Sequence, residues 1–95
     1  MSETIFVTAE LKMNADKPRQ QVFEAIEQFC LDMQNEAGCL QANATYDPKD
    51  PQRVILWERY ENRAAIEAHF AMPHTQAFIA AEMAELVQAF ETQAQ

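Results

Sequence analysis

Residues 54–60 read Val-Ile-Leu-Trp-Glu-Arg-Tyr, and this stretch decides the fold. Branched and aromatic side chains favour a pleated strand, so we predict a strand here. Residues 40–46 alternate apolar and polar side chains, which predicts a second strand. The segment between them, residues 47–52, reads Asp-Pro-Lys-Asp-Pro-Gln and is typical of a turn. The two strands should therefore form an antiparallel hairpin.

The residues before this hairpin predict a strand followed by a helix. Residues 4–13 alternate, with one face formed by Ile5, Val7, Ala9, Leu11 and Met13. The helix has apolar residues at helical spacing, namely Val22, Phe23, Ile26, Phe29, Cys30 and Met33. We expect Asp16 to cap it, Pro18 to lie in its first turn, and Gly38 to adopt positive φ just beyond its end near Glu36.

The residues after the hairpin predict a broken helix and a closing strand. Asn62 can cap a short helix that carries Ala65, Ile66, His69 and Phe70 on one face, and Pro73 interrupts it. A second helical stretch from about His74 carries Phe78, Ile79, Met83 and Leu86, and the tail from Val87 alternates like a strand. The order β-α-β-β-α-β predicts an α+β, ferredoxin-like domain over residues 1–95, with both helices on one face of an antiparallel sheet.

Composition excludes several classes of function. The 95 residues are 48% hydrophobic, which suits one globular domain. A net charge of −8 disfavours partners with phosphate backbones and anionic membrane surfaces, so we expect neither nucleic acid nor membrane as a partner. Gly38 is the only glycine, which excludes glycine-rich phosphate-binding loops, and Ser2 is the only serine, which argues against a serine hydrolase.

The first residues and the cysteines point to the cytoplasm. An acid stands where a signal peptide would have a basic flank, and Thr8 and Glu10 interrupt the apolar run, so we expect neither an export signal nor a membrane span. Cys30 and Cys39 match no redox-motif spacing. We predict a cytoplasmic protein with two free thiols and disfavour a disulfide between them.

The sheet face away from the helices predicts a homodimer. If the register holds, that face carries Phe6, Thr8, Ile55, Trp57 and Phe90. An apolar patch of this size usually marks an interface, and sheet-to-sheet packing of two copies would cover it. The alternative is that these side chains are exposed singly.

The residues that could carry chemistry cluster around the second half of the chain. Alternation places Glu58 and Tyr60 on the helix-facing side of their strand, where a carboxylate needs a partner. His69 lies on the apolar stripe of the following helix, so a Glu58–His69 hydrogen bond would satisfy both groups and make the imidazole a base. The same pair can also be purely structural, and His74 can either approach this cavity or cap the broken helix.

We expect no metal. A zinc site made from His69, His74 and a cysteine is disfavoured because the two histidines are off helical register and Pro73 intervenes.

The chain resembles the antibiotic biosynthesis monooxygenase family of dimeric α+β barrels. The resemblance rests on ordered blocks along nearly the whole chain, which are Val7-Thr-Ala-Glu-Leu-Lys, Glu36-Ala-Gly-Cys-Leu, Asp47-Pro-Lys-Asp-Pro-Gln-Arg, Leu56-Trp-Glu-Arg-Tyr, Ala65-Ile-Glu-Ala-His and Met72-Pro-His. It implies a ferredoxin-like protomer, a homodimer and, in some members, oxygenation of quinols or aromatics with neither metal nor flavin. Tyr60 stands where many members carry Trp, and residues 78–85 lack a histidine that could ligate haem.

Two functions of different class remain open. The first is cofactor-independent monooxygenation of a small hydroquinone or phenol, with His69 as base, Glu58 as its orienting partner, and Tyr60, Phe70 and Phe78 as cavity wall; His74 would hydrogen-bond a substrate oxygen. The second is a dimer that binds a small metabolite, or isomerises it with the two histidines as acid and base. Few arginines lie near the proposed cavity in sequence, which argues against a phosphorylated ligand.

Overall fold

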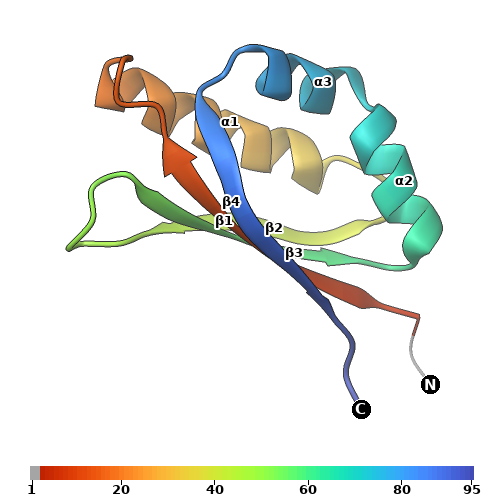
Figure 1. The fold of residues 1–95 in the computed structure, drawn as a ribbon. Coiled ribbons are helices and arrows are strands. Elements are labelled where there is room, and N and C mark those ends of the chain that lie inside the picture. Colours follow the sequence, from red (N-terminus) through yellow and green to blue (C-terminus); the bar gives the residue numbers. More distant parts are fainter. Residues whose placement is uncertain (1–2) are drawn as a thin grey trace.

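A computed structural model of the chain describes residues 3–95, so Ser2 lies outside the described residues. Its elements are β1 (Ile5–Met13), α1 (Arg19–Gln34), β2 (Cys39–Tyr46), β3 (Arg53–Tyr60), α2 (Arg63–Ala71), α3 (Pro73–Ala80) and β4 (Ala84–Thr92). The four strands form an antiparallel sheet in the order β2-β3-β1-β4, and the helices cover one face of it (Figure 1). The predicted ferredoxin-like α+β fold is confirmed.

The core lies between α1 and the helix-facing side of the sheet. The predicted alternation on β1 and β3 is confirmed, because Leu11, Val54 and Leu56 are buried there. The predicted stripe of α1 contributes the buried side chains Val22, Ile26, Phe29, Cys30 and Met33. Cys30 and Cys39 are free thiols, and burial raises the pKa of Cys30 to about 12, which keeps this thiol protonated.

Two expectations about helix ends need correction. Asp16 does not cap α1: the helix begins at Arg19 after Pro18, and no side chain caps it. The predicted helix from His74 to Leu86 is too long, since α3 ends at Ala80 and β4 already begins at Ala84. Glu82 adopts a φ of 53°, a left-handed conformation that turns the chain from α3 into β4. Apolar periodicity did not reveal this turn because Met83 and Leu86 also suit a strand.

Position 38 requires a glycine because the loop packs too closely against α2 to leave room for a side chain. The prediction of a positive φ at this position was wrong, since no described glycine has one. A Cβ atom on Gly38 would instead collide with the side chain of Ala65 in α2. The loop between α1 and β2 therefore approaches α2 closely, and the backbone oxygen of Gly38 accepts a 2.9 Å hydrogen bond from Glu61 N.

Replacing Gly38 by alanine should destabilise the protein by about 1–3 kcal/mol, because overpacking forces the loop and α2 apart. Urea denaturation measures this loss. In a double-mutant cycle, Ala65→Gly should recover part of the loss in the Gly38→Ala background, although by itself it costs about 1 kcal/mol in a helix. Strict additivity of the two changes would contradict the proposed contact.

Candidate functional site

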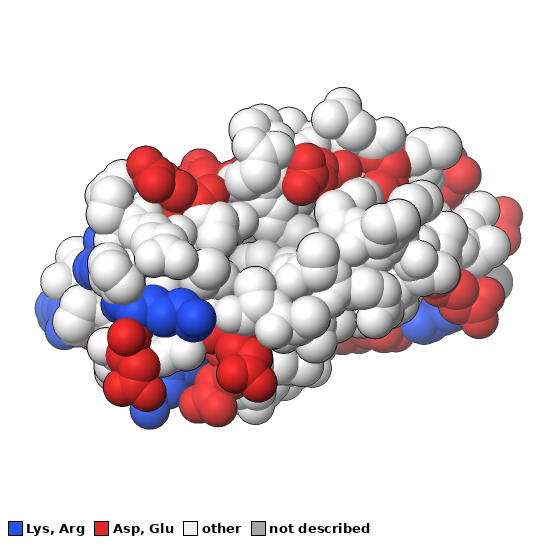
Figure 2. All heavy atoms as spheres, turned by 90° about the horizontal axis from the view of Figure 1, so that it is seen from above, with Lys and Arg blue, Asp and Glu red and all other residues white. Residues whose placement is uncertain are grey.

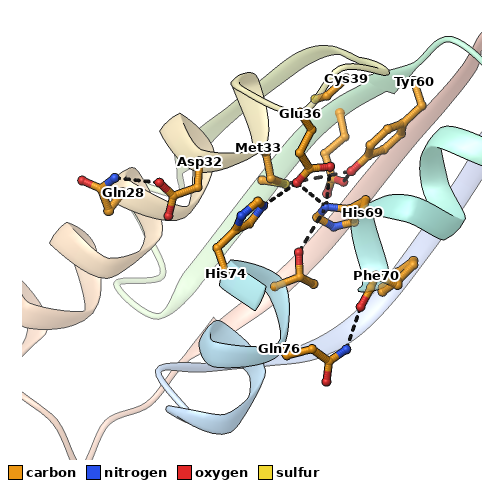
Figure 3. Close-up of polar contacts among 12 residues, drawn as sticks. Gln28, Asp32, Met33, Glu36, Cys39, Tyr60, His69, Phe70, His74 and Gln76 are labelled. Atoms are coloured by element: carbon orange, nitrogen blue, oxygen red, sulfur yellow. Dashed lines mark hydrogen bonds and ion pairs between the residues drawn. The ribbon is translucent and has the colours of Figure 1, made fainter. Parts of the chain in front are cut away.

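The centre of the candidate site is the carboxylate of Glu36, which lies between two imidazoles (Figure 3). Its Oε2 atom is 3.0 Å from Nδ1 of His69 and 2.5 Å from Nε2 of His74. Glu36 comes from the loop after α1, His69 from α2 and His74 from α3. The side chains of Glu36 and His69 are 5% and 6% exposed, whereas that of His74 is 25% exposed.

Pro73 brings the two histidines together. The backbone of Met72 is extended, with φ −67° and ψ 140°, as expected for the residue before a proline. Helix α2 therefore stops, and Pro73 starts α3 in a new direction. His74 therefore reaches the same carboxylate as His69, as one of the two predicted alternatives allowed, and the helical register that disfavoured them as joint metal ligands does not keep them apart.

The hydrogen-bond network fixes the tautomer of His69. A carboxylate only accepts hydrogen bonds, so Nδ1 of His69 and Nε2 of His74 must carry the protons that they share with Glu36. The remaining ring nitrogen of His69, Nε2, makes no hydrogen bond within residues 3–95. Nε2 of His69 is therefore not engaged by the described part of the protein.

His69 lines a cavity between the sheet and the helices α2 and α3. The cavity has a volume of about 670 Å³, within the range of small-molecule sites, and its wall is mostly apolar. Tyr60, Phe70 and Phe78 line it as expected. The exposed side chains of Phe70, Ile79 and Leu86 mark the rim, on the two short helices and on β4.

Aromatic rings surround the imidazole of His69 and hold its plane. Its ring centroid lies 5.1 Å from that of Phe70, 5.5 Å from that of Tyr60 and 5.9 Å from that of Phe29. Phe29 in turn stacks on Phe78 with the centroids 4.2 Å apart. The imidazole therefore meets the cavity within a largely apolar wall.

The expected hydrogen bond between Glu58 and His69 is not formed, and this prediction was wrong. Glu58 accepts a hydrogen bond from the Tyr60 hydroxyl with an oxygen–oxygen distance of 2.5 Å. The two residues are two positions apart on the same face of β3, so the phenol reaches the carboxylate without help from a helix. Glu58 and Tyr60 both line the cavity, as a second polar pair beside His69.

Burial raises the pKa values of both residues of this second pair, Glu58 and Tyr60. It raises the pKa of the Glu58 carboxyl, and the hydrogen bond from Tyr60 and the nearby His69 oppose that rise. Burial also raises the pKa of the Tyr60 phenol, and the negative charge of Glu58 raises it further. Tyr60 therefore stays a neutral donor.

Glu36 is the functional residue that the sequence argument missed. It lies 33 positions from His69 and 38 from His74. No periodicity links residues so far apart, and the acid lay at the expected end of a helix. The single signal for it was its place in the block Glu36-Ala-Gly-Cys-Leu.

The fold and the site together describe a small ferredoxin-like α+β protein whose histidine faces an aromatic-lined cavity beneath its helices. The chain belongs to the antibiotic biosynthesis monooxygenase family, whose model matches residues 4–81. No helix within residues 3–95 is both long and apolar enough to cross a membrane.

Proteins of two bacteria are similar to this chain in sequence. The YjcS protein of Bacillus subtilis (strain 168) is 29% identical over 70 residues, which cover 74% of this chain and 67% of that protein. Protein sll1783 of Synechocystis sp. is 28% identical over 78 residues, covering 81% of this chain and 52% of that protein, so the chain spans about half of this longer relative.

Solved structures share the fold. The structure of YjcS has a TM-score of 0.87 at 24% identity, covering 97% of this chain and 99% of that chain. SnoaB, a cofactor-independent oxygenase from Streptomyces nogalater, has a TM-score of 0.83 at 6% identity, covering 99% of this chain and 95% of that chain.

Substituting Tyr60 by phenylalanine should cost about 1–3 kcal/mol of unfolding free energy, because it leaves the buried Glu58 carboxyl without its donor. Chemical denaturation measures the loss. Tyr46→Phe is the matched control, since Tyr46 donates a similar 2.6 Å hydrogen bond to Glu27 at the surface and should lose less than about 1 kcal/mol. Equal losses in the two variants would contradict a role for burial.

Proposed function

We propose that this protein is a cofactor-independent monooxygenase that acts on a small hydroquinone or phenol. The single observation that carries the proposal is the Glu36–His69 pair, which leaves the second imidazole nitrogen without a protein partner on a residue that lines an aromatic-walled cavity. Membership of the monooxygenase family supports the reaction class. The similarity to SnoaB supports the fold on which such chemistry is known.

In the proposed mechanism, Nε2 of His69 takes the phenolic proton, and Glu36 positions the imidazole and stabilises its charged form. The resulting phenolate is electron-rich and reduces molecular oxygen directly. A ring carbon forms a bond to one oxygen atom to give a hydroperoxide; the O–O bond then breaks, and the second oxygen leaves as water with the ring proton. All the electrons that reduce oxygen come from the substrate, and a hydroxyquinone is the product of a hydroquinone.

In this proposal, the cavity wall positions the substrate and excludes water from it. Tyr60, Phe70 and Phe78 would hold the substrate ring, and the apolar lining would keep water from the anion. His74, which we first expected to hydrogen-bond a substrate oxygen, instead has Nε2 on Glu36, so we assign it a positioning role. General-base assistance is worth roughly two to four powers of ten in rate, so positioning must supply much of the remaining acceleration.

The charges around the cavity favour an uncharged substrate. The charged residues that line it are all acids, namely Glu58, Glu85 and Glu91. The nearby cation Arg63 is already paired with Glu91, at 2.5 Å. Figure 2 shows an uncharged middle on the face seen from above, with acidic side chains along its edges and basic ones at the left and lower right. This arrangement supports a neutral quinol over a phosphorylated or carboxylated ligand.

Oxygen uptake with a panel of hydroquinones tests the proposal. His69→Ala should slow the reaction by roughly two to four powers of ten, because the proton acceptor is lost. Glu36→Gln should lower kcat with little change in KM, since the base remains but its positioning partner is weakened. Glu24→Gln, the same change at an exposed site on α1, should leave the rate unchanged.

An unchanged rate in His69→Ala would contradict the mechanism. A compound that raises the melting temperature without any oxygen consumption by the wild-type protein would instead favour metabolite binding or isomerisation.

We also propose that two copies pack through the sheet face that the helices leave uncovered. Strand register places the five predicted residues on this face: Thr8 pairs with both Trp57 and Phe90, and Ile55 and Phe6 lie at the adjacent same-face positions. Trp57 and Phe90 are 42% and 55% exposed. A second copy of the same face would cover this patch.

The variant Trp57→Glu/Phe90→Glu should be monomeric, because each copy would bring two charges into an apolar contact. Sedimentation velocity measures the change in mass. Leu31→Glu alters a side chain that is 53% exposed on α1 and should leave the dimer intact. Dimers that persist in the double variant would contradict the proposed interface.

A further inference from the structure

We propose that Glu36, His69 and His74 also form a binding site for one divalent transition-metal ion, and that the bound ion switches off the base. The three potential ligand atoms, a carboxylate oxygen and two imidazole nitrogens, all lie within 4.8 Å of one another. This donor set suits Zn²⁺ and its first-row neighbours and lacks the many oxygen ligands that Ca²⁺ requires.

The spacing of the donor atoms is close to that of a coordination site. Zinc–nitrogen and zinc–oxygen bonds of about 2.0–2.2 Å place tetrahedral ligand atoms roughly 3.4 Å apart. The carboxylate oxygen of Glu36 is now 3.0 Å from one nitrogen and 2.5 Å from the other. No two of the three atoms are more than 4.8 Å apart, so side-chain shifts of about 1 Å each would bring all three separations to this tetrahedral value.

The fold already holds the three metal-binding side chains close together before any ion binds. The three side chains come from separate elements and already point toward one another (Figure 3). Glu36 and His69 are nearly inaccessible to solvent, so little ordering is needed on binding, while the partly exposed His74 gives an ion access from outside.

His69 cannot bind the ion and act as the proposed base at the same time. When the ion takes the place of the proton on Nδ1 of His69, the neutral imidazole carries that proton on Nε2 instead, so Nε2 becomes a donor and can no longer take a phenolic proton. This consequence rests on the proposed function, whereas the metal site itself does not.

Isothermal titration of chelator-treated protein with Zn²⁺ tests the site, and Co²⁺ gives an independent absorption signature of its coordination geometry. We expect one ion per chain. His74→Gln keeps a donor for Glu36 but removes a metal ligand, and Glu36→Gln removes the anionic ligand; each should weaken Zn²⁺ binding by about a hundredfold or more, given that even outer partners of ligands contribute 10–100-fold. Glu24→Gln should bind as the wild type does.

The result that overturns the site is the absence of one-to-one binding, or binding that neither variant weakens. The activity measurement is separate. If Zn²⁺ binds at the site and the metal-free protein does not consume oxygen, the proposed function fails and the metal site stands. If metal-free protein is active and saturating Zn²⁺ leaves its rate unchanged, the switch is wrong.

Discussion

The arrangement of the site depends on one buried carboxylate that two imidazoles share. Burying the charge of Glu36 is costly unless hydrogen bonds replace its water, and His69 and His74 provide them. The loop after α1, the end of α2 and the start of α3 must therefore meet at one point. The same contact leaves one nitrogen of His69 without a protein partner, so the interaction that stabilises the charge also orients the proposed base.

A short interruption in the second helical region makes this meeting possible. A continuous helix would carry the residues of the two histidines to different faces, since five positions correspond to more than one turn. Pro73 ends that helix and sets the next one at a new angle. The break thus determines the site, and the same three side chains can hold either protons or a metal ion.

The sequence predicted the fold better than it predicted the site, for a physical reason. Alternation in β1 and β3, the stripe of α1, the Asn62 cap and the Pro73 break are local patterns, and each was confirmed. The partner of His69 was not predictable in this way, because Glu36 reaches it across 33 positions through the packing of a loop on a helix. Burial correctly indicated that Glu58 needs a partner, but its strand neighbour Tyr60 supplies one at shorter reach than His69.

The close contact between Gly38 and Ala65 affects the separation of Glu36 and His69, which lie near them in the sequence. Gly38 lies two positions after the acid, and Ala65 lies about one turn before His69 on the same helix. Their contact acts as a spacer that sets how far the acid stands from the imidazole. A single methyl group at this contact would push the loop of Glu36 away from α2, so the geometry of the Glu36–His69 pair depends partly on a residue that has no side chain.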